Sequence, residues 1–412
     1  MENLELELEK NRQIEIVEPY KLPDGWKWCK QSEVCKLIDG EKIADKEYPY
    51  LEVKYLRGNK EKKYVTSGKF ISAGTKVILV DGENSGEVFT VPEDGFMGST
   101  FKALSIQNVN EEYLQLFIET KKDLYRNNKK GSAIPHLNKD LFFNMPFPLP
   151  PINSQLSIVN SIGTMFTKLD QAQEKAQAVL DSFETRKAAI LHKAFTGQLT
   201  ANWRKENGVL DDSWEEKTVG DCCVEVKVGI VIKPTRYYTE AEKGIPAFRS
   251  ANVRENHIDD FDWVYINDEG MKNEQRSIVH TNDVLVVRSG APGTACVVTD
   301  QFDGYNAIDI LIAVPTQDII NSYFLCYYTN SPMGKNIVAE KKRGLGLTHF
   351  NVKGYSATQI KVPTLPEQQE IVRILDTVLE KESRAKEAVQ KVLDQIALLK
   401  KSILARAFRG KV

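Results

Sequence analysis

The sequence predicts an α+β protein in which two mixed α/β domains are joined by two long helices that form an antiparallel coiled coil. Three observations predict this fold. The chain repeats itself with a pseudo-twofold relation, two segments have helical periodicity, and the remainder alternates short apolar runs with Gly, Asn and Asp. At 412 residues, with 42% hydrophobic and 27% charged residues, it is long enough for two or more folded domains.

The repeat unit of the sequence is about half of the chain. At a constant offset of 213 residues, GSAIPHLN (131–138) matches GLGLTHFN (344–351), and PPINSQLSIV (150–159) matches PTLPEQQEIV (363–372). The same offset places ILHKAFTG (190–197) on ILARAFRG (403–410). LPDGW (22–26) matches LDDSW (210–214) at an offset of 188, so the second half is longer by 25 residues, 213 minus 188. Each half therefore has a variable body and a repeated tail.

Each tail is predicted to be one long helix. Prolines precede each helix, Gly197 and Gly410 stand where a C-terminal cap belongs, and the length is about 42 residues or roughly 63 Å. Apolar residues follow alternating steps of four and three, as in a coiled coil. The first seam is Ile158, Ile162, Met165, Leu169, Ala172, Ala176, Val179, Phe183 and Ile190, with Arg186 filling the one gap. The second is Ile371, Leu375, Val378, Ala385, Val389, Val392, Ile396, Leu399 and Ile403, interrupted only by Glu382.

The two helices are predicted to pair, because neither apolar seam is stable in water without a partner. A compact second body has its ends close together, so the second helix should run back along the first. This antiparallel arrangement predicts one body at each end of a rod roughly 60 Å long.

The bodies, roughly residues 21–149 and 209–362, are predicted to be mixed modules rather than parallel doubly wound sheets. Runs such as VILV (77–80), VLVV (284–287) and ILIAV (310–314) indicate strands, and helices are expected near 111–127 and 318–339. The predicted division is a first domain at 1–149 with a charged leader at 1–20, a central helix at 150–200, a second domain at 201–362 and a C-terminal helix at 363–412.

The composition favours a cytoplasmic, soluble protein. We find no secretory signal in the Glu-rich first twenty residues and no run of eighteen apolar residues, so we expect no membrane contact. The cysteines form no CxxC pair, which favours reduced thiols over a disulfide framework or zinc site. The net charge of −2 argues against a simple polyanion-binding protein, yet basic residues cluster near 54–63, 121–130 and 341–343.

Catalytic motifs are weak throughout the chain. NMPF (144–147) has Met145 where an adenine-binding methyltransferase motif needs proline, and the chain has no phosphate-binding glycine loop. Asp39 with Glu52 and Lys54, and likewise Asp221 with Glu225 and Lys227, fit a loose nuclease pattern that holds Mg²⁺. A self-contained DNA-binding nuclease is therefore the alternative, and a structural coiled-coil scaffold without DNA affinity is a second one. A duplicated chain without a catalytic site favours binding to a nearly two-fold symmetric partner, such as duplex DNA.

The duplicated order of body, proline-led helix and AF-x-G helix ending resembles the specificity subunit of type I restriction-modification systems over essentially the whole chain. The resemblance implies that the bodies are target recognition domains, each for one half of a split, asymmetric double-stranded DNA target. It implies that the helices hold two methyltransferase subunits and, through them, restriction subunits. Catalysis, S-adenosylmethionine, ATP and Mg would belong to those partners, and this chain would be non-catalytic.

Basic side chains beside Gly and Asn loops suit phosphate contacts, and Arg in loops suits base contacts. Arg288, which follows a strand and precedes a Gly-rich loop, is the preferred base reader. The predicted DNA-binding residues are Lys54, Arg57, Lys60, Lys62, Lys63, Lys129 and Lys130 in the first body, and Arg249, Arg254, Arg288, Lys341, Lys342 and Arg343 in the second.

Apolar residues outside the seams recur on both helices at matching positions. They either pack against the bodies or form a surface for the methyltransferase subunits, and the second alternative makes them subunit-interface residues. They are Phe166, Leu180, Phe195, Leu379, Leu393 and Phe408.

Overall fold

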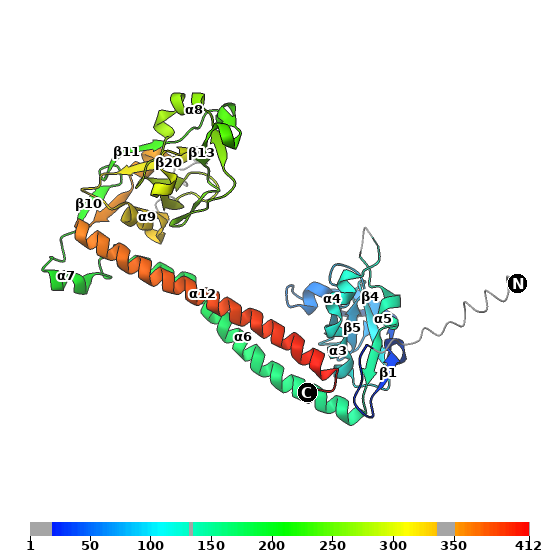
Figure 1. Ribbon diagram of the computed structural model, residues 1–412. Coiled ribbons are helices and arrows are strands. Elements are labelled where there is room, and N and C mark those ends of the chain that lie inside the picture. The colour runs from blue at the N-terminus through cyan, green and yellow to red at the C-terminus, as the bar shows by residue number, and fades with distance from the viewer. Residues whose placement is uncertain (1–18, 132–134, 336–350, 412) are drawn as a thin grey trace. The chain divides into compact units, whose positions relative to one another are not determined.

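The computed structural model describes residues 19–131, 135–335 and 351–411 (Figure 1). The chain divides into two compact units. Unit 1 contains residues 1–177 and 391–412, and unit 2 contains residues 178–390. Each unit therefore holds one α/β body together with a piece of both long helices.

The body of unit 1 is built on a four-stranded antiparallel sheet in the order β2-β8-β5-β6, from β2 (Cys35–Ile38), β8 (Phe101–Ile106), β5 (Lys76–Leu79) and β6 (Val88–Thr90). Strands β3 (Glu41–Leu51), β4 (Tyr64–Ile71) and β7 (Gly95–Met97) close a small barrel, and β1 (Lys27–Lys30) pairs with β9 (Pro146–Leu149). All four residues of β5 are buried, as the apolar run VILV predicts. The remaining elements are η1 (Gln31–Glu33), α2 (Val53–Leu56), α3 (Glu111–Thr120), α4 (Lys122–Asn127) and α5 (Lys139–Phe143).

The body of unit 2 has the same central sheet in the order β11-β20-β17-β18, from β11 (Cys223–Val228), β20 (Ile310–Pro315), β17 (Val284–Val287) and β18 (Ala295–Val297). A second sheet has the order β12-β16-β13-β19, from β12 (Tyr238–Thr239), β16 (Val264–Ile266), β13 (Ile245–Phe248) and β19 (Asn306–Ala307). The remaining strands are β10 (Glu215–Thr218), β14 (Val253–Arg254), β15 (His257–Ile258) and β21 (Gln359–Val362). The helices are α7 (Ala201–Asn207), α8 (Asp268–Asn273), α9 (Ser322–Asn330) and α11 (Val352–Ser356), with η2 (Pro234–Tyr237), η3 (Ala241–Lys243), η4 (Gln275–Ser277) and η5 (Asp300–Phe302).

The mixed, mainly antiparallel modules that the sequence predicts are confirmed. Parallel pairing joins β3 to β7 in unit 1 and β13 to β19 in unit 2, while the central sheets are antiparallel. The six cysteines are buried and free, as expected. The two bodies are thus variations on one topology.

The two long helices, α6 (Ile152–Phe195) and α12 (Leu365–Ala407), lie side by side and run antiparallel (Figure 1). In unit 2, Arg186 bonds to Glu382 at 2.7 Å and Glu184 to Lys386 at 3.1 Å, so residue numbers rise on one helix as they fall on the other. In unit 1, Lys400 bonds to Asp170 at 2.5 Å. The predicted antiparallel coiled coil is confirmed.

Part of the predicted seam is exposed. Met165 and Val179 are 37% and 41% exposed, and Val392 and Leu399 are 44% and 51% exposed, although all four belong to the predicted seams. The seam residues of α6 at 158, 162, 169, 176, 183 and 190 are buried or partly buried, and the last five of them follow the seven-residue spacing of a heptad. Residues 166, 180, 187, 191 and 194 are also buried or partly buried, so the buried surface of α6 is broader than the predicted seam.

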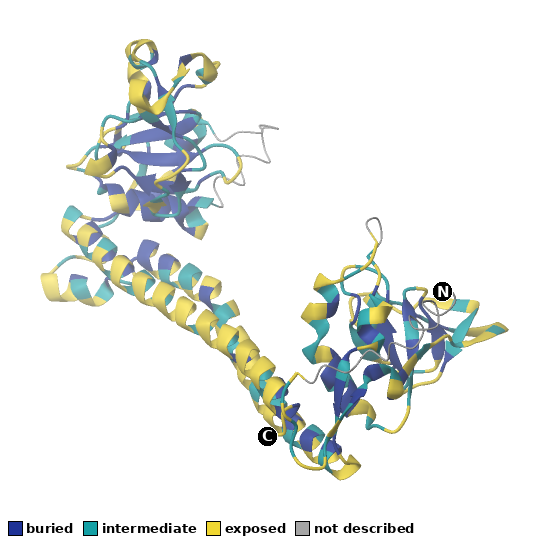
Figure 2. Ribbon diagram, turned by 45° about the vertical axis from the view of Figure 1, so that its right-hand side comes forward, coloured by how far each residue is buried: buried dark blue, intermediate teal, exposed yellow. Residues whose placement is uncertain are grey.

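Each body is joined to a long helix by the same buried glutamine. Gln155 accepts a hydrogen bond from the Asn110 amide at 2.7 Å and donates one to the Pro150 carbonyl at 2.8 Å. Gln368, 213 residues later, accepts from the Asn321 amide at 2.7 Å and donates to the Pro363 carbonyl at 2.8 Å. Figure 2 shows buried residues where the helices meet the bodies and exposed residues along their middle parts.

Candidate DNA interface

The first predicted basic cluster lies on the segment between β3 and β4. Lys60 bonds to Glu52 at 2.6 Å. This hydrogen bond is the main reason why the pKa of Glu52 lies below its usual value, and the charges of Lys60, Lys54 and Lys63 lower it further. Three of the predicted cations therefore gather around one carboxylate. The structure brings them together as the sequence analysis expected, in an arrangement suited to phosphate contacts.

The other two cations of this segment are engaged with glutamates. Arg57 pairs with Glu87, and Lys62 bonds to Glu93, which also accepts a hydrogen bond from Tyr55. Among the described residues, no ion pair within 4 Å is recorded for the side chains of Lys54 and Lys63. Those two lysines are thus the better placed of the five to neutralise phosphates.

Lys129 and Lys130 lie on a segment that is tied to the loop after β5. Lys129 bonds to Glu83 and Lys130 to Asp140, each at 2.5 Å. His136 contacts Asp81 through Nδ1 at 2.7 Å, and backbone bridges join His136 to both Asp81 and Lys130. Asp81 matches Arg288 in the repeat, so the equivalent loop carries opposite charge in the two bodies.

Each predicted arginine of the second body that the structure describes is paired with an aspartate. Arg249 bonds to Asp262 at 2.8 Å, and Arg254 to Asp259 at 2.8 Å. Ion pairs of this kind at a surface contribute about 0–1 kcal/mol, so they orient an arginine without preventing its transfer to a phosphate. Lys341, Lys342 and Arg343 lie outside the described residues.

Arg288, the preferred base reader of the sequence analysis, is largely buried. Its side chain is only 15% exposed, and its guanidinium bonds to Asp309 at 2.6 Å. Asp309 has a left-handed backbone with φ of 52°, and its amide donates to the carbonyl of Ile230. Arg288 therefore holds together the loops that follow β11, β17 and β19. Sequence alone could not show this, because the aspartate lies 21 residues away in the chain.

The six predicted subunit-interface residues fall into two groups. Phe408 lies 5.0 Å from Tyr113 and 5.3 Å from Phe117 between ring centroids, and Phe195 lies 5.4 Å from Phe324 and 5.2 Å from Tyr328. Both phenylalanines are buried, so packing against the bodies is the alternative that the structure shows for them. Phe166, Leu180, Leu379 and Leu393 are partly buried, and Phe166 and Leu379 pack against the cores of their units.

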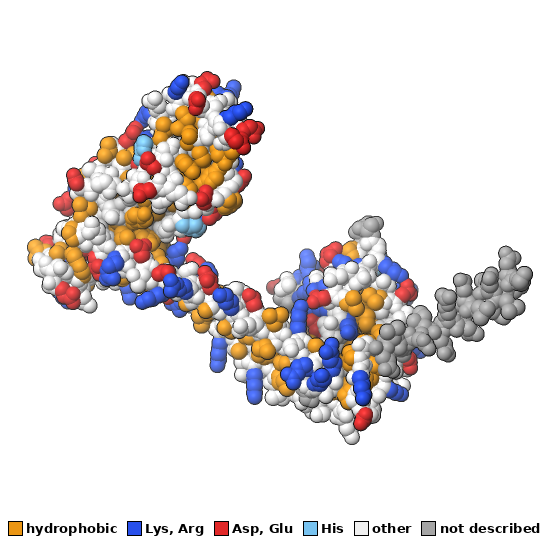
Figure 3. All heavy atoms as spheres, in the orientation of Figure 1, with side chains coloured by type: hydrophobic (Ala, Val, Ile, Leu, Met, Phe, Trp, Pro, Cys, Tyr) orange, Lys and Arg blue, Asp and Glu red, His pale blue; other side chains and the backbone are white. Residues whose placement is uncertain are grey.

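Other apolar side chains on the helices are exposed, and sequence reasoning missed them as surface residues. The sequence feature that indicates an exposed apolar surface is the pair Leu398 and Leu399, because consecutive helical residues cannot both face one partner helix. In unit 1 the exposed fractions reach 66% for Leu398 and 51% for Leu399. The others in unit 1 are Ile152, Leu156, Met165 and Val392. Figure 3 shows hydrophobic side chains on the surface of these helices.

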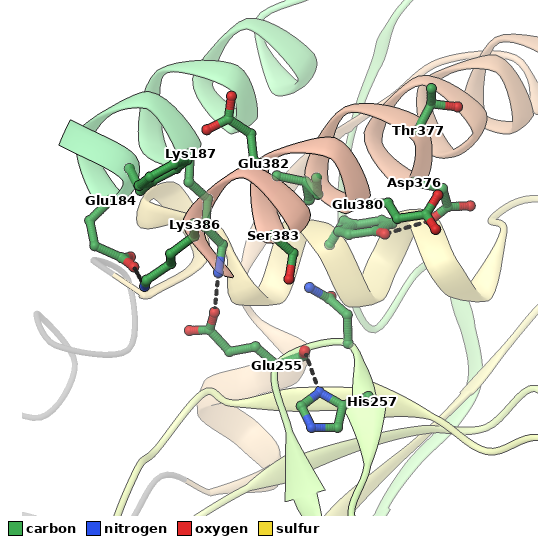
Figure 4. A pocket seen from close by; sticks show the side chains of 14 residues that line it. Glu184, Lys187, Glu255, His257, Asp376, Thr377, Glu380, Glu382, Ser383 and Lys386 are labelled. Atoms are coloured by element: carbon green, nitrogen blue, oxygen red, sulfur yellow. Dashed lines mark hydrogen bonds and ion pairs between the residues drawn. The ribbon is translucent and has the colours of Figure 1, made fainter. Parts of the chain in front are cut away.

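A cavity of about 770 Å³ lies in unit 2, between the β14–β15 turn, α9 and the two long helices (Figure 4). Several of its side chains are engaged in hydrogen bonds and ion pairs within the unit. Glu255 bonds to Lys187 of α6 at 2.5 Å and also to Lys335, while Tyr327 donates to Asp376 of α12 at 2.5 Å. These bonds attach the body to the helices within the unit, which is a structural role.

The carboxylates of the proposed nuclease sites are also engaged elsewhere. Asp39 bonds to Lys69 at 2.5 Å and to Lys102 at 2.7 Å, and these hydrogen bonds lower its pKa to about 2. Glu225 pairs with Arg276. Within the described ranges, no group of three or more His, Cys, Asp or Glu side chains could hold a metal ion. The nuclease alternative is not supported.

No helix in the described part of the chain is long and apolar enough to cross a membrane. The fold defines a duplicated protein, in which two α/β bodies with the same sheet order but different charged surfaces are each joined to a shared antiparallel helix pair. Such a chain is a two-module binding scaffold.

The comparisons with known proteins agree with this class. The family model described as the type I restriction modification DNA specificity domain matches residues 23–180 and again residues 211–394, so the chain belongs to that family. It is 25% identical over 425 residues to the type I restriction enzyme MjaVIII specificity subunit of Methanocaldococcus jannaschii, covering 95% of this chain and 94% of the relative. It is 20% identical to the EcoBI specificity subunit of Escherichia coli, covering 94% and 86%.

Two solved structures share the fold along nearly the whole chain. One belongs to a study of complex assembly in the type I R-M system, with a TM-score of 0.75 and 18% identity, covering 96% of this chain and all of the other. The HsdS subunit from Thermoanaerobacter tengcongensis has a TM-score of 0.58 and 18% identity, covering 96% and 99%.

Proposed function

We propose that this chain is the DNA sequence-recognition subunit of a type I restriction-modification complex, and that each body contacts one half of an asymmetric, bipartite target. The observation that carries this proposal is the double match to a DNA specificity domain, on two bodies that share a sheet order. Their charged surfaces differ. Lysines around Glu52 mark the first body, whereas arginine–aspartate pairs mark the second. Unlike surfaces on like folds suit two different half-sites.

The helices are proposed to carry two methyltransferase subunits and, through them, restriction subunits. S-adenosylmethionine, ATP and Mg would be bound by those partners. The support is the exposed apolar surface of α6 and α12 in unit 1, since apolar patches on a folded protein mark interaction sites. The 44 residues of α6 span about 66 Å, or roughly two turns of DNA at about 34 Å each, so we propose that the long helices set the spacer between half-sites.

Salt-dependent DNA binding tests the role of the first body. The full chain with its methyltransferase partner should bind its target with an affinity that falls linearly on a logarithmic salt scale. Lys54→Gln with Lys63→Gln should reduce the slope by about 0.9 per lysine, because each removed cation releases one counterion fewer. Lys205→Gln, in α7, is the matched control and should leave the slope unchanged. An unchanged slope in the double variant would exclude these lysines as phosphate contacts.

The division of labour is tested by activity. The purified chain incubated with DNA and Mg²⁺ should neither cleave nor methylate, and methylation should require the partner and S-adenosylmethionine. Cleavage by the chain alone would overturn the proposal. Leu398→Asp with Leu399→Asp should abolish co-purification with the methyltransferase while the chain stays folded, whereas Leu210→Asp, at an equally exposed leucine outside the long helices, should not.

A further inference from the structure

The loop after β11 in unit 2 combines a rigid base with an exposed apolar tip. Gly229 and Ile230 are buried at the base. A Cβ atom at Gly229 would lie 2.2 Å from the carbonyl oxygen of Ala307, so only glycine fits there. The Ile230 amide donates to the same carbonyl at 2.8 Å, and the Ile230 carbonyl accepts from Asp309 at 3.1 Å. The base of the loop is thus fixed to the segment that follows β19.

The tip projects two large aliphatic side chains into solvent. Val231 is 49% exposed and Ile232 is 73% exposed. The next residue, Lys233, is also exposed and has a left-handed backbone with φ of 46° and ψ of 55°. It precedes Pro234, which disfavours helical conformations of the residue before it. Strained backbone of this kind costs about 1–3 kcal/mol and clusters at binding sites.

Cationic residues follow the apolar tip in the chain. Lys233 adjoins it in sequence, and no ion pair is recorded for its side chain among the residues that the structure describes. Arg236 follows in η2, where it stacks on Tyr237 and pairs with Glu274 at 3.4 Å. Arg288 reaches the loop through Asp309, which bonds both to its guanidinium and to the carbonyl of Ile230. An apolar tip beside cationic residues suits duplex DNA, because DNA carries anionic phosphates on its outside and apolar base surfaces inside.

The equivalent loop of unit 1 has another chemistry. There β2 is followed by Asp39 and Gly40, and Asp39 bonds to Lys69 and Lys102. Gly40 is as crowded as Gly229, since its Cβ would lie 2.4 Å from the carbonyl oxygen of Phe70. Only Asp39 and Gly40 separate β2 from β3, whereas residues 229–233 separate β11 from η2, so the projecting tip belongs to unit 2 alone among the two described loops. A position of this kind is where two half-sites of different sequence would be distinguished.

We infer that Val231 and Ile232 contact base edges of the half-site bound by unit 2, by packing against a thymine methyl group, while Lys233 contacts a neighbouring phosphate. This inference rests on the proposed function of the chain. Apolar side chains distinguish thymine from the other bases in the major groove through this methyl group. The inference moves the base-reading role from Arg288 to the exposed tip that Arg288 supports.

The experiment selects duplexes from a randomised DNA pool with the complete chain and its methyltransferase partner. Wild type should enrich one bipartite motif with a defined A·T position in the half assigned to unit 2. Ile232→Ser combined with Val231→Ser should relax that position, with roughly tenfold weaker binding to the wild-type motif and an unchanged salt slope. Lys233→Gln should instead weaken binding to all sequences and reduce the slope by about 0.9.

Two controls separate the possible outcomes. Val224→Ser, at a valine on β11 that is 74% exposed, should leave the motif unchanged. Ile232→Val keeps a branched apolar side chain and should recognise the same motif as wild type. Thermal unfolding should show that each variant is folded. If wild type enriches no motif, the proposed function fails. If wild type enriches a motif that the double serine variant recognises equally well, only this inference fails. Loss of methyltransferase binding with retained DNA specificity would assign the tip to a protein contact and overturn it.

Discussion

At the scale of single residues, the most informative site away from the candidate DNA interface is the buried ion pair between Arg204 and Glu367. Arg204 follows the end of α6, and Glu367 lies in the first turn of α12. Their side chains are 7% and 0% exposed and bond at 2.6 Å, and the Thr200 hydroxyl donates to the same carboxylate at 2.6 Å. Burial is the largest single influence and opposes the charged form of Arg204, but the hydrogen bonds to Glu367 and Asp211 and the charges of both carboxylates together raise its pKa.

We predict that Glu367→Ala lowers the free energy of unfolding by about 3–5 kcal/mol, because it removes the buried carboxylate from a buried guanidinium and leaves only the exposed Asp211 at 3.3 Å. Arg204→Met combined with Glu367→Leu should cost much less, since both charges are removed together. Equilibrium unfolding in urea measures these differences. Glu370→Ala, one turn along α12, is the control and should change stability by less than about 1 kcal/mol. Equal losses in the single and double variants would contradict this account.

A second residue-scale prediction concerns pH. Burial of Glu255 raises the pKa of its carboxyl, but hydrogen bonds from Lys187 and Lys335 reverse this and lower the pKa below its usual value. The stabilisation is therefore present above the ordinary glutamate pKa and is lost as the pH falls through the lowered value. We expect amide exchange at residues 253–258 to accelerate on acidification below about pH 4.5, after correction for intrinsic rates.

The Glu255→Gln variant should weaken this dependence, because glutamine does not titrate. Glu380→Gln, whose carboxylate pairs with Arg384 of its own helix, provides the comparison and should preserve the wild-type profile. A Glu255→Gln profile that matches wild type would show that the ion pairs do not hold the β14–β15 turn.

At the scale of elements, the buried surface of the long helices is broader than the predicted heptad seam. Leu180 is partly buried on this surface, whereas its neighbour Val179 is 41% exposed, although the heptad pattern placed Val179 in the seam. We predict that Leu180→Ala destabilises unit 2 by about 1 kcal/mol or more, because it removes packed methyl groups. Val179→Ala should be close to neutral. Thermal unfolding of the two variants tests this difference. A larger loss of stability at Val179 than at Leu180 would show that Val179 is the packed residue.

Some of these features could be predicted from the sequence and others could not. Helical periodicity and preceding prolines predicted both long helices, a compact second body predicted their antiparallel pairing, and apolar runs predicted β5, β17 and β20. The exposure of Val179 and Leu399 was not predicted, because a heptad pattern assigns every apolar residue at its spacing to the contact. The paired state of Arg249, Arg254 and Arg288 was not predictable, because tertiary contacts supply their aspartates. The exposed tip at Val231 and Ile232 was missed because an apolar run in a sequence predicts burial.

At the scale of the whole molecule, the two ends of the described chain meet within unit 1. The Tyr20 hydroxyl donates to the carbonyl of Phe408 at 2.8 Å, and Arg409 stacks on the Tyr20 ring. A Cβ atom at Gly410 would lie 2.2 Å from Cγ of Pro23. The LPDGW segment therefore packs against the end of α12, so unit 1 is completed by residues from both ends.

We predict that a circularly permuted chain folds and retains its DNA specificity. A short flexible linker would join residue 411 to residue 19, and the new ends would be opened in the exposed segment at residues 210–212. Its methylation motif, measured with the methyltransferase partner, should equal that of wild type. Opening the chain within buried β17 is the control and should prevent folding. A folded permutant with an altered motif would show that chain order contributes to recognition.

The buried glutamines Gln155 and Gln368 have a consequence for how new specificities arise. Gln155 bonds to the main-chain amide of Asn110 and the carbonyl of Pro150. Gln368 bonds to the amide of Asn321 and the carbonyl of Pro363. A joint made through the backbone places little demand on the side chains of the module that it holds. We therefore expect a body of foreign sequence but the same fold to be accepted at this joint; under the proposed function, such an exchange would change one half-target and leave the partner enzyme unaltered.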